Sequence, residues 1–185
     1  DWKIEDVTFL KSYSKVKFSV LDKVYHFKCK LFAYYQIENL ICSMAVANSY
    51  NIPIKSLLAW IENIKEPPGR LEKIYLRKKN STIFIDYAHT PSALKINLMH
   101  LRKNFLRKGR LKVLFGCGGN RDVGKRKLMG KYASKFADEV YVTDDNPRYE
   151  NPKKIREQIA LHIKKPVIIP DRKKAIKKAI KNLEE

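Results

Sequence analysis

The run Asp144-Asp145-Asn146-Pro147-Arg148 places carboxylates, a carboxamide and a guanidinium close together along the chain. It follows the short apolar segment 139–143, which we predict to be a buried strand. In an open α/β sheet, ligands bind in the crevice at the carboxyl ends of the strands. Pro147 fixes its own φ and biases Asn146 away from helical backbone. A ligand with both an ammonium group and a carboxylate would suit this cluster, and a capped turn is the alternative for the run alone.

A second polar cluster, residues 86–91, leaves another predicted strand at residues 82–86. A carboxylate such as Asp86 at the end of a strand can accept hydrogen bonds from ribose hydroxyls. His89 could donate a hydrogen bond to a phosphate. The alternative for this segment alone is that Asp86 binds loop amides and His89 packs against the protein.

A third cluster is the glycine-containing segment 116–126, between a predicted strand and a predicted helix. Glycines allow close approach of the backbone to an anion, and the start of a helix offers free amides. The segment is not a P-loop, because no Gly-Lys-Ser/Thr follows at the required spacing. It is not a dinucleotide fingerprint either, because Arg121 stands where the third glycine belongs. The Arg121 guanidinium would suit a carboxylate ligand. Cys117 has no neighbouring base, so we interpret it as a structural thiol. A plain glycine turn is the alternative.

The formal net charge of +20 raises the possibility of a nucleic-acid partner. The lysines are scattered, however, and in residues 172–181 they alternate with apolar residues at helical spacing, with Ile176, Ala179, Ile180 and Leu183 on the apolar face. We therefore interpret them as a solvated helix face and predict no nucleic-acid partner. A basic, non-catalytic module that binds nucleic acid stays as an alternative function.

Nothing in the sequence favours membrane insertion or export. The longest apolar runs are shorter than the roughly 18 residues that a membrane helix needs, and the first residues do not resemble a signal peptide. The three cysteines lack the spacing of metal ligands. We expect a cytoplasmic, monomeric protein without membrane insertion.

The pattern of apolar residues changes along the chain. Residues 16–31 alternate as a β-hairpin does, and residues 37–48 and 54–64 have the spacing of two helices. After a Pro-Pro-Gly linker at residues 65–69, strands alternate with helices. This alternation predicts an α/β fold with a mostly parallel sheet and helices on both faces. The predicted strands are 82–86, 111–115, 139–143 and 166–169, and the helices after them are 90–109, 128–136, 155–163 and 173–183.

Taken together, the three clusters resemble the Mur ligase family, ATP-dependent enzymes that form amide bonds in peptidoglycan synthesis. Within the family they are most similar to the ligases that add meso-diaminopimelate to UDP-N-acetylmuramoyl-L-alanyl-D-glutamate. The resemblance implies that residues 1–66 end a central ATP-binding domain and that residues 67–185 form most of a Rossmann-like C-terminal domain. The residues that carry it are 68–72, 86–91, 116–126, 128–130 and 143–148.

The resemblance also implies an ATP site. Asn39 matches the second asparagine of a family motif near the adenine, and Gln36 takes the place of the first, with a longer reach. Arg70 matches an arginine that contacts ATP. Asp86 matches the aspartate that holds the ribose, and His89 is placed with it at this site.

Four further positions match those that contact the incoming meso-diaminopimelate: Arg121, Asp145, Asn146 and Arg148. Asn120 replaces a frequent aspartate in the same loop. Arg148 is expected to select diaminopimelate by pairing with the carboxylate remote from the reacting amine, which lysine lacks.

The implied reaction has two steps. ATP phosphorylates the D-glutamyl carboxylate, and the amine of diaminopimelate then displaces phosphate from the acyl phosphate. Mg²⁺ assists such transfers, but the family's main Mg²⁺ ligands would precede Asp1 and part of the amino-acid pocket would follow Glu185. We therefore expect a fragment that contains no catalytic residue or metal ligand and is inactive alone. A folylpolyglutamate synthetase-like ligase is the nearer alternative, against which the Asp-Asn-Pro-Arg run argues.

Overall fold

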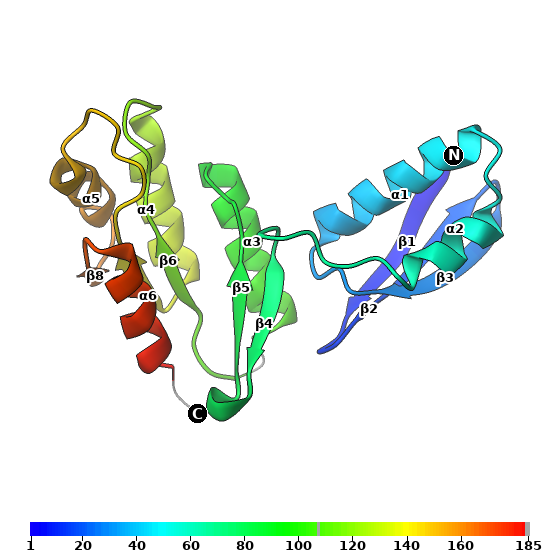
Figure 1. The fold of residues 1–185 in the computed structure, drawn as a ribbon, viewed down its shortest axis with the longest axis horizontal. Helices are drawn as coiled ribbons and strands as arrows, with labels where there is room; N and C mark the ends of the chain where they lie inside the picture. The colour runs from blue at the N-terminus through cyan, green and yellow to red at the C-terminus, as the bar shows by residue number, and fades with distance from the viewer. Residues whose placement is uncertain (107, 184–185) are drawn as a thin grey trace. The chain divides into compact units, whose positions relative to one another are not determined.

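The computed structural model describes residues 1–106 and 108–183. The chain divides into two compact units. Unit 1 contains Asp1–Ile74 and Ile83–Tyr87, and unit 2 contains Tyr75–Thr82 and the described residues from Ala88 onward. Figure 1 labels the helices and strands of both units.

Unit 1 contains an antiparallel sheet of three strands in the order β1-β2-β3. β2 (Ser14–Val20) and β3 (Lys23–Cys29) form the predicted hairpin. Leu21 and Asp22 connect them with φ values of 46° and 65°, the left-handed backbone of a tight hairpin turn. β1 (Trp2–Phe9) is an additional strand that the sequence analysis did not predict.

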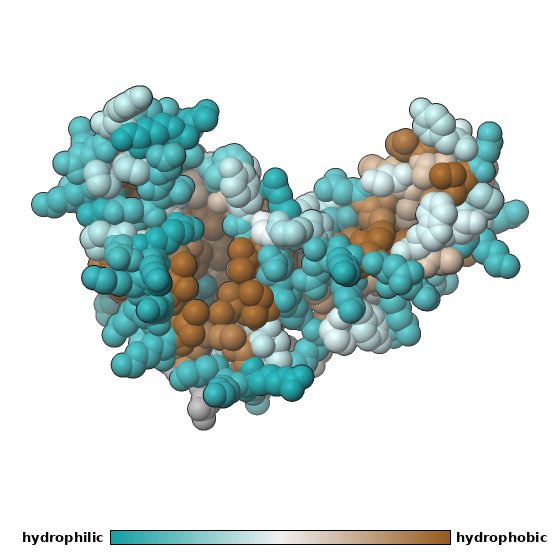
Figure 2. Space-filling model, in the orientation of Figure 1, coloured by the Kyte–Doolittle hydropathy of each residue, from teal (hydrophilic) through white to brown (hydrophobic). Residues whose placement is uncertain are grey.

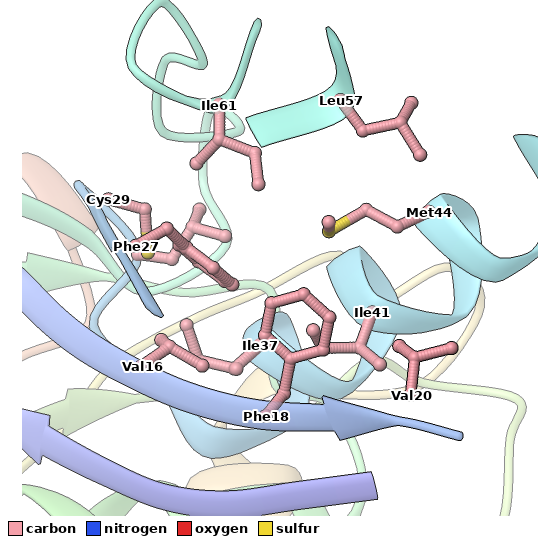
Figure 3. Close-up of a cluster of buried hydrophobic side chains, with 11 residues drawn as sticks. Val16, Phe18, Val20, Phe27, Cys29, Ile37, Ile41, Met44, Leu57 and Ile61 are labelled. Carbon is pink, nitrogen blue, oxygen red and sulfur yellow. The ribbon is translucent and has the colours of Figure 1, made fainter. Parts of the chain in front are cut away.

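Two helices pack on this sheet, as predicted: α1 (Tyr34–Ser49) and α2 (Ile54–Ile61). Figure 3 shows side chains from β2, β3 and both helices meeting in one buried apolar cluster. This cluster is the core of unit 1 and fixes the position of the first turn of α1. Its labelled members are Val16, Phe18, Val20, Phe27, Cys29, Ile37, Ile41, Met44, Leu57 and Ile61.

Unit 2 contains a parallel sheet in the order β6-β7-β8, formed by Lys112–Phe115, Glu139–Val142 and Pro166–Ile168. Val140 and Val142 pack into a core with residues of the helices α3, α4 and α5. Between them, Tyr141 points to the opposite face, where its hydroxyl accepts a hydrogen bond from Asn182 just after α6. Helices therefore cover both faces, as expected. The helices are α3 (Pro91–Asn104), α4 (Gly124–Phe136), α5 (Pro152–Ala160) and α6 (Arg172–Lys181).

The structure differs from the prediction at the strand expected over residues 82–86. This segment forms β5 (Ser81–Ile85), which pairs with β4 (Glu72–Leu76) in a separate two-stranded sheet. The short 3-10 helix η1 (Arg77–Lys79) and Asn80, at a φ of 44°, connect the two strands. β4 was not predicted, because Ile74, Tyr75 and Leu76 are consecutive apolar residues and do not alternate with polar ones.

The lysines of α6 are exposed, which agrees with their interpretation as a solvated helix face. Figure 2 shows hydrophilic residues over α6 beside apolar surface at β6. The buried contact of the helix is Ala175. The predicted apolar face was wrong in part, since Ile176 and Ile180 are exposed. In the described part of the chain, no helix has the length and hydrophobicity needed to cross a membrane.

Candidate functional site

In unit 1, the Gln36 side chain connects the backbone at Arg70 to the backbone at the start of α1 by hydrogen bonds. The Gln36 side chain is only 5% exposed. Its Oε1 accepts hydrogen bonds from the backbone N–H groups of Phe32 and Ala33, each at 2.9 Å. Its Nε2 donates to the carbonyl oxygen of Arg70 at 2.5 Å. Both ends of the carboxamide therefore bind the main chain, which gives Gln36 a structural role.

Asp86 connects the end of β5 to the same region. Its Oδ2 accepts hydrogen bonds from the Tyr35 hydroxyl at 3.2 Å and from the Leu71 N–H at 2.8 Å. Burial, together with the Asp86 charge, raises the pKa of Tyr35 to about 12, so the hydroxyl stays protonated and acts as a donor. Leu71 is buried with a φ of 51°, a backbone conformation that is unusual for leucine. Asp86 thus holds an uncommon turn directly beside Arg70.

Arg70 itself is exposed, and its guanidinium carbon lies 5.1 Å from the centre of the Tyr87 ring. Such a cation–π contact orients the guanidinium without neutralising its charge. Asn39 is exposed on α1, four residues after Tyr35, so these two side chains lie on the same face of the helix. Unit 1 therefore gathers Arg70, Asp86 and Asn39 around the first turns of α1.

His89 belongs to unit 2, where its carbonyl oxygen accepts a hydrogen bond from Lys125 Nζ at 3.2 Å. It directly precedes Thr90, whose Oγ1 accepts a hydrogen bond from the Ala93 N–H and caps α3. The helix predicted to begin at residue 90 therefore starts with Thr90 as its cap and Pro91 in its first turn.

The other candidate residues of unit 2 stand on two neighbouring loops. The glycine loop (residues 116–123) follows β6, and the Asn-Pro loop (residues 143–151) follows β7. β6 and β7 are paired in parallel, with Phe115 opposite Val142, so both loops leave the same edge of the sheet. This is the edge where ligands bind in open α/β sheets.

The glycines of the glycine loop are required by contact between the loops. A Cβ atom on Gly116 would lie 2.4 Å from the carbonyl oxygen of Thr143. A Cβ atom on Gly119 would lie 1.9 Å from the carbonyl oxygen of Pro147. These glycines were expected to make room for an anion, but at these two positions the Asn-Pro loop occupies the space.

Hydrogen bonds join the two loops. The Gly119 N–H donates to the Asn146 carbonyl oxygen at 2.9 Å, and Arg148 Nη1 donates to the Gly119 carbonyl oxygen at 2.7 Å. The Tyr149 N–H donates to Asn120 Oδ1 at 3.0 Å. Asn120 and Arg148 both have a φ of 49°, which asparagine tolerates better than most residues do. Asn120 therefore has a clear local function in the loop contact.

All four residues predicted to bind an amino acid lie on these joined loops. Arg121 is exposed on the glycine loop, and Asp145, Asn146 and Arg148 are exposed on the Asn-Pro loop. The Asn146 side chain also accepts a hydrogen bond from the Arg148 N–H at 3.1 Å, as in an Asx turn. The arrangement offers two guanidinium groups for carboxylates and a carboxylate for an ammonium group.

The Cys117 thiol points into the core of unit 2 and is only 3% exposed. Burial raises its pKa to about 11, and its Sγ lies 3.6 Å from Met129 Sδ. A protonated thiol is a poor nucleophile, so the structure supports the interpretation of Cys117 as a packing residue.

The partner of Arg126, which was not predicted, is Glu150 on the Asn-Pro loop. Arg126 lies three residues before Met129 and seven before Ala133, on the buried face of α4. A cation at a buried helical position requires a carboxylate partner. The position of Arg126 on the apolar face of the helix could therefore have predicted such a partner.

The Mur ligase glutamate ligase domain family matches residues 69–185. The chain therefore belongs to the Mur ligase family. It is 39% identical, over 172 residues, to the UDP-N-acetylmuramoyl-L-alanyl-D-glutamate–2,6-diaminopimelate ligase of Rickettsia conorii, covering 92% of this chain and 35% of that protein. The same ligase of Mesorhizobium japonicum is 42% identical over 146 residues, 79% of this chain and 30% of that protein. The chain thus spans about a third of the length of these relatives.

Solved structures agree with this assignment. A structure of a UDP-N-acetylmuramoyl-L-alanyl-D-glutamate–2,6-diaminopimelate ligase has a TM-score of 0.64 and 30% identity, covering 98% of this chain and 37% of that one. Folylpolyglutamate synthase of Mycobacterium tuberculosis, in complex with ADP and AMPPCP, has a TM-score of 0.78 at 20% identity, covering 97% and 40%. The second comparison shows the shared fold alone.

Proposed function

We propose that this chain is the part of an ATP-dependent ligase that holds ATP and meso-diaminopimelate. The ligase joins the amine of diaminopimelate to the D-glutamyl carboxylate of UDP-N-acetylmuramoyl-L-alanyl-D-glutamate through an acyl phosphate. The observation that supports this function best is the pair of joined loops, which carries Arg121 and Arg148 at the carboxyl edge of the sheet. The particular substrates in this proposal are taken from the names of the relatives.

For ATP, the proposed residues are Asn39, Arg70, Asp86 and His89. Arg70 is exposed and keeps its charge, so it can pair with a phosphate. Asp86 stands at the end of β5, where it can accept hydrogen bonds from ribose hydroxyls. In the described residues, no group of three or more His, Cys, Asp or Glu side chains is arranged to hold a metal. Such phosphoryl transfers use Mg²⁺, and the proposal names no residue of this chain as its ligand.

For the amino acid, meso-diaminopimelate carries a second ammonium and a second carboxylate at the stereocentre remote from the reacting amine. Arg148 is proposed to bind that remote carboxylate, and Arg121, Asp145 and Asn146 complete the contacts. A guanidinium has five N–H donors, so the bond from Arg148 to Gly119 leaves it capacity for a carboxylate. Lysine has no carboxylate at this position and would leave Arg148 unpaired.

The proposed domain boundary follows the linker, with residues 1–66 ending a central ATP-binding domain and residues 67–185 in the C-terminal domain. A cytoplasmic, monomeric ligase is part of the same proposal. Membership of the Mur ligase family argues against the alternative of a nucleic-acid-binding module. The similarity to folylpolyglutamate synthase reflects a common fold and favours no folate substrate.

Phosphate release by the complete protein that contains this chain tests the proposal. We expect release only when ATP, UDP-N-acetylmuramoyl-L-alanyl-D-glutamate and meso-diaminopimelate are all present. A parallel reaction with a folate and L-glutamate should give no product. Release with the folate pair, or release that does not depend on diaminopimelate, would reject the proposed substrates.

A further inference from the structure

One ion pair of unit 2 lies between the two loops and is almost fully buried on its cationic side. Arg126 Nη1 donates to Glu150 Oε2 and Arg126 Nη2 to Glu150 Oε1, both at 2.9 Å. Arg126 is 1% exposed, and its Nη1 also donates to Gln158 Oε1 of α5 at 2.6 Å. The two parallel bonds give the pair a defined geometry, which a single bond would not.

This ion pair reaches the glycine loop on both sides of Gly119. Glu150 Oε1 accepts a hydrogen bond from the Asn120 N–H, and Arg126 Nη2 lies 3.5 Å from the carbonyl oxygen of Gly118. Gly119, between these two contacts, supplies the carbonyl oxygen that binds Arg148. The pair therefore fixes the backbone around the residue that orients the Arg148 guanidinium.

Stability alone is a poor explanation for this arrangement. Removing an arginine from water is costly, and a buried ion pair often contributes less than apolar residues of the same volume would. In the part of the chain that the structure describes, Arg126 Nε is a buried side-chain nitrogen without a hydrogen-bond partner. An unsatisfied buried donor adds a further cost. Defined geometry is what this pair provides and apolar packing could not.

We propose that Arg126 and Glu150 are positioning residues that set the place of the Arg148 guanidinium and thereby the preference for an amino acid with a second carboxylate. This inference rests on the proposed function of the two loops. The pair touches no reacting atom, so it acts on the binding of the amino acid and leaves the ATP site unaffected.

The central variant is Glu150→Gln, which keeps the size of the side chain but removes the charge that faces Arg126. The matched control is Glu157→Gln, which makes the same change in the exposed ion pair between Lys153 and Glu157 on α5, at 3.9 Å. In the complete ligase we expect Glu150→Gln to raise the KM for meso-diaminopimelate about tenfold, the change that corresponds to about 1.4 kcal/mol of lost binding. The KM for ATP should change less than about twofold, because substitutions have little effect on a distant site that they do not contact.

A second measurement reads the loop directly and needs no substrate. Hydrogen exchange followed by mass spectrometry should show faster exchange in residues 116–123 of Glu150→Gln and no change there in Glu157→Gln. A folded Glu150→Gln protein with unchanged exchange in this segment, or an unchanged KM for diaminopimelate, would overturn the positioning role. If the wild-type ligase does not use diaminopimelate, the proposed function is wrong. The exchange measurement would still show whether Glu150 holds the glycine loop in place.

Discussion

Arg148 Nη1 donates a hydrogen bond to the carbonyl oxygen of Gly119 at 2.7 Å, so the residue proposed to select the substrate is oriented by the neighbouring loop. Both loops follow adjacent parallel strands, and Gly119 lies where no larger residue would fit. The position of one guanidinium therefore depends on the packing of two loops.

Gly119→Ala should separate the loops, because the added Cβ would lie 1.9 Å from the carbonyl oxygen of Pro147. Such overpacking typically costs about 1–3 kcal/mol, which should lower the midpoint of urea unfolding. The KM for meso-diaminopimelate should rise as well. Gly124→Ala is the control, because the nearest atom to its added Cβ is the movable Asp122 carboxylate oxygen at 3.2 Å. Equal effects of the two substitutions would contradict the loop-packing account.

Gln36→Ala should destabilise unit 1, because it leaves two backbone N–H groups and the Arg70 carbonyl oxygen without their partner. Unsatisfied buried groups of this kind cost about 1–3 kcal/mol each, so a clear fall in melting temperature is expected. The control is Ser43→Ala on the same helix, which removes a bond from an exposed hydroxyl to the Asn39 carbonyl oxygen. A melting temperature equal to that of the control would show that Gln36 is dispensable.

The three cysteines should differ in reactivity. Cys42 is exposed, whereas Cys29 and Cys117 are buried and burial raises the pKa of each thiol. A thiol reagent at pH 8 should modify Cys42 in the folded protein and reach the other two only after unfolding. Peptide mapping by mass spectrometry identifies the modified residues. Rapid modification of Cys117 in the folded protein would contradict the burial of its thiol in the core of unit 2.

The Arg126–Glu150 pair should make stability depend on pH at the acidic end. Hydrogen bonds from Arg126 and from the Asn120 N–H lower the pKa of Glu150 from 4.5 to about 2. A carboxyl group with a lowered pKa in the folded state stabilises it above its ordinary pKa, and this contribution is lost as the pH falls through the lowered value. The difference in melting temperature between wild type and Glu150→Gln should therefore be full above pH 4.5 and shrink towards pH 2. A difference that is constant from pH 7 to about pH 2 would exclude this linkage.

The sequence predicted the elements that have strong periodicity and the polar clusters that follow them. The hairpin of β2 and β3, the helices and the parallel strands β6 to β8 were all foreseen, because their apolar residues repeat at the expected spacing. β1 and β4 were missed. In β4, three consecutive apolar residues give no alternation, and the pairing of β5 with β4 depends on contacts that periodicity does not report.

Within the candidate site, the sequence indicated which residues stand on the loops, but it did not show what holds them. The tight approach of Gly119 to Pro147 and the burial of Arg126 arise from contacts between segments that are distant along the chain, and Arg126 and Glu150 are 24 residues apart. Local sequence windows cannot describe such a meeting, since they record neighbours along the chain. The structural role of Gln36 likewise arises from its hydrogen bond to Arg70, a residue 34 positions further along the chain.

The most direct test of the central claim compares meso-diaminopimelate with L-lysine as substrates of the complete ligase. Wild type should prefer diaminopimelate in kcat/KM by at least about a hundredfold, because lysine leaves a charged donor unpaired. The variant Arg148→Asn should lose most of this preference, and asparagine is chosen because it tolerates the φ of 49° at this position. The control variant Lys131→Asn, on the exposed face of α4, should keep the preference. Equal use of lysine by the wild type, or full selectivity in Arg148→Asn, would contradict the account.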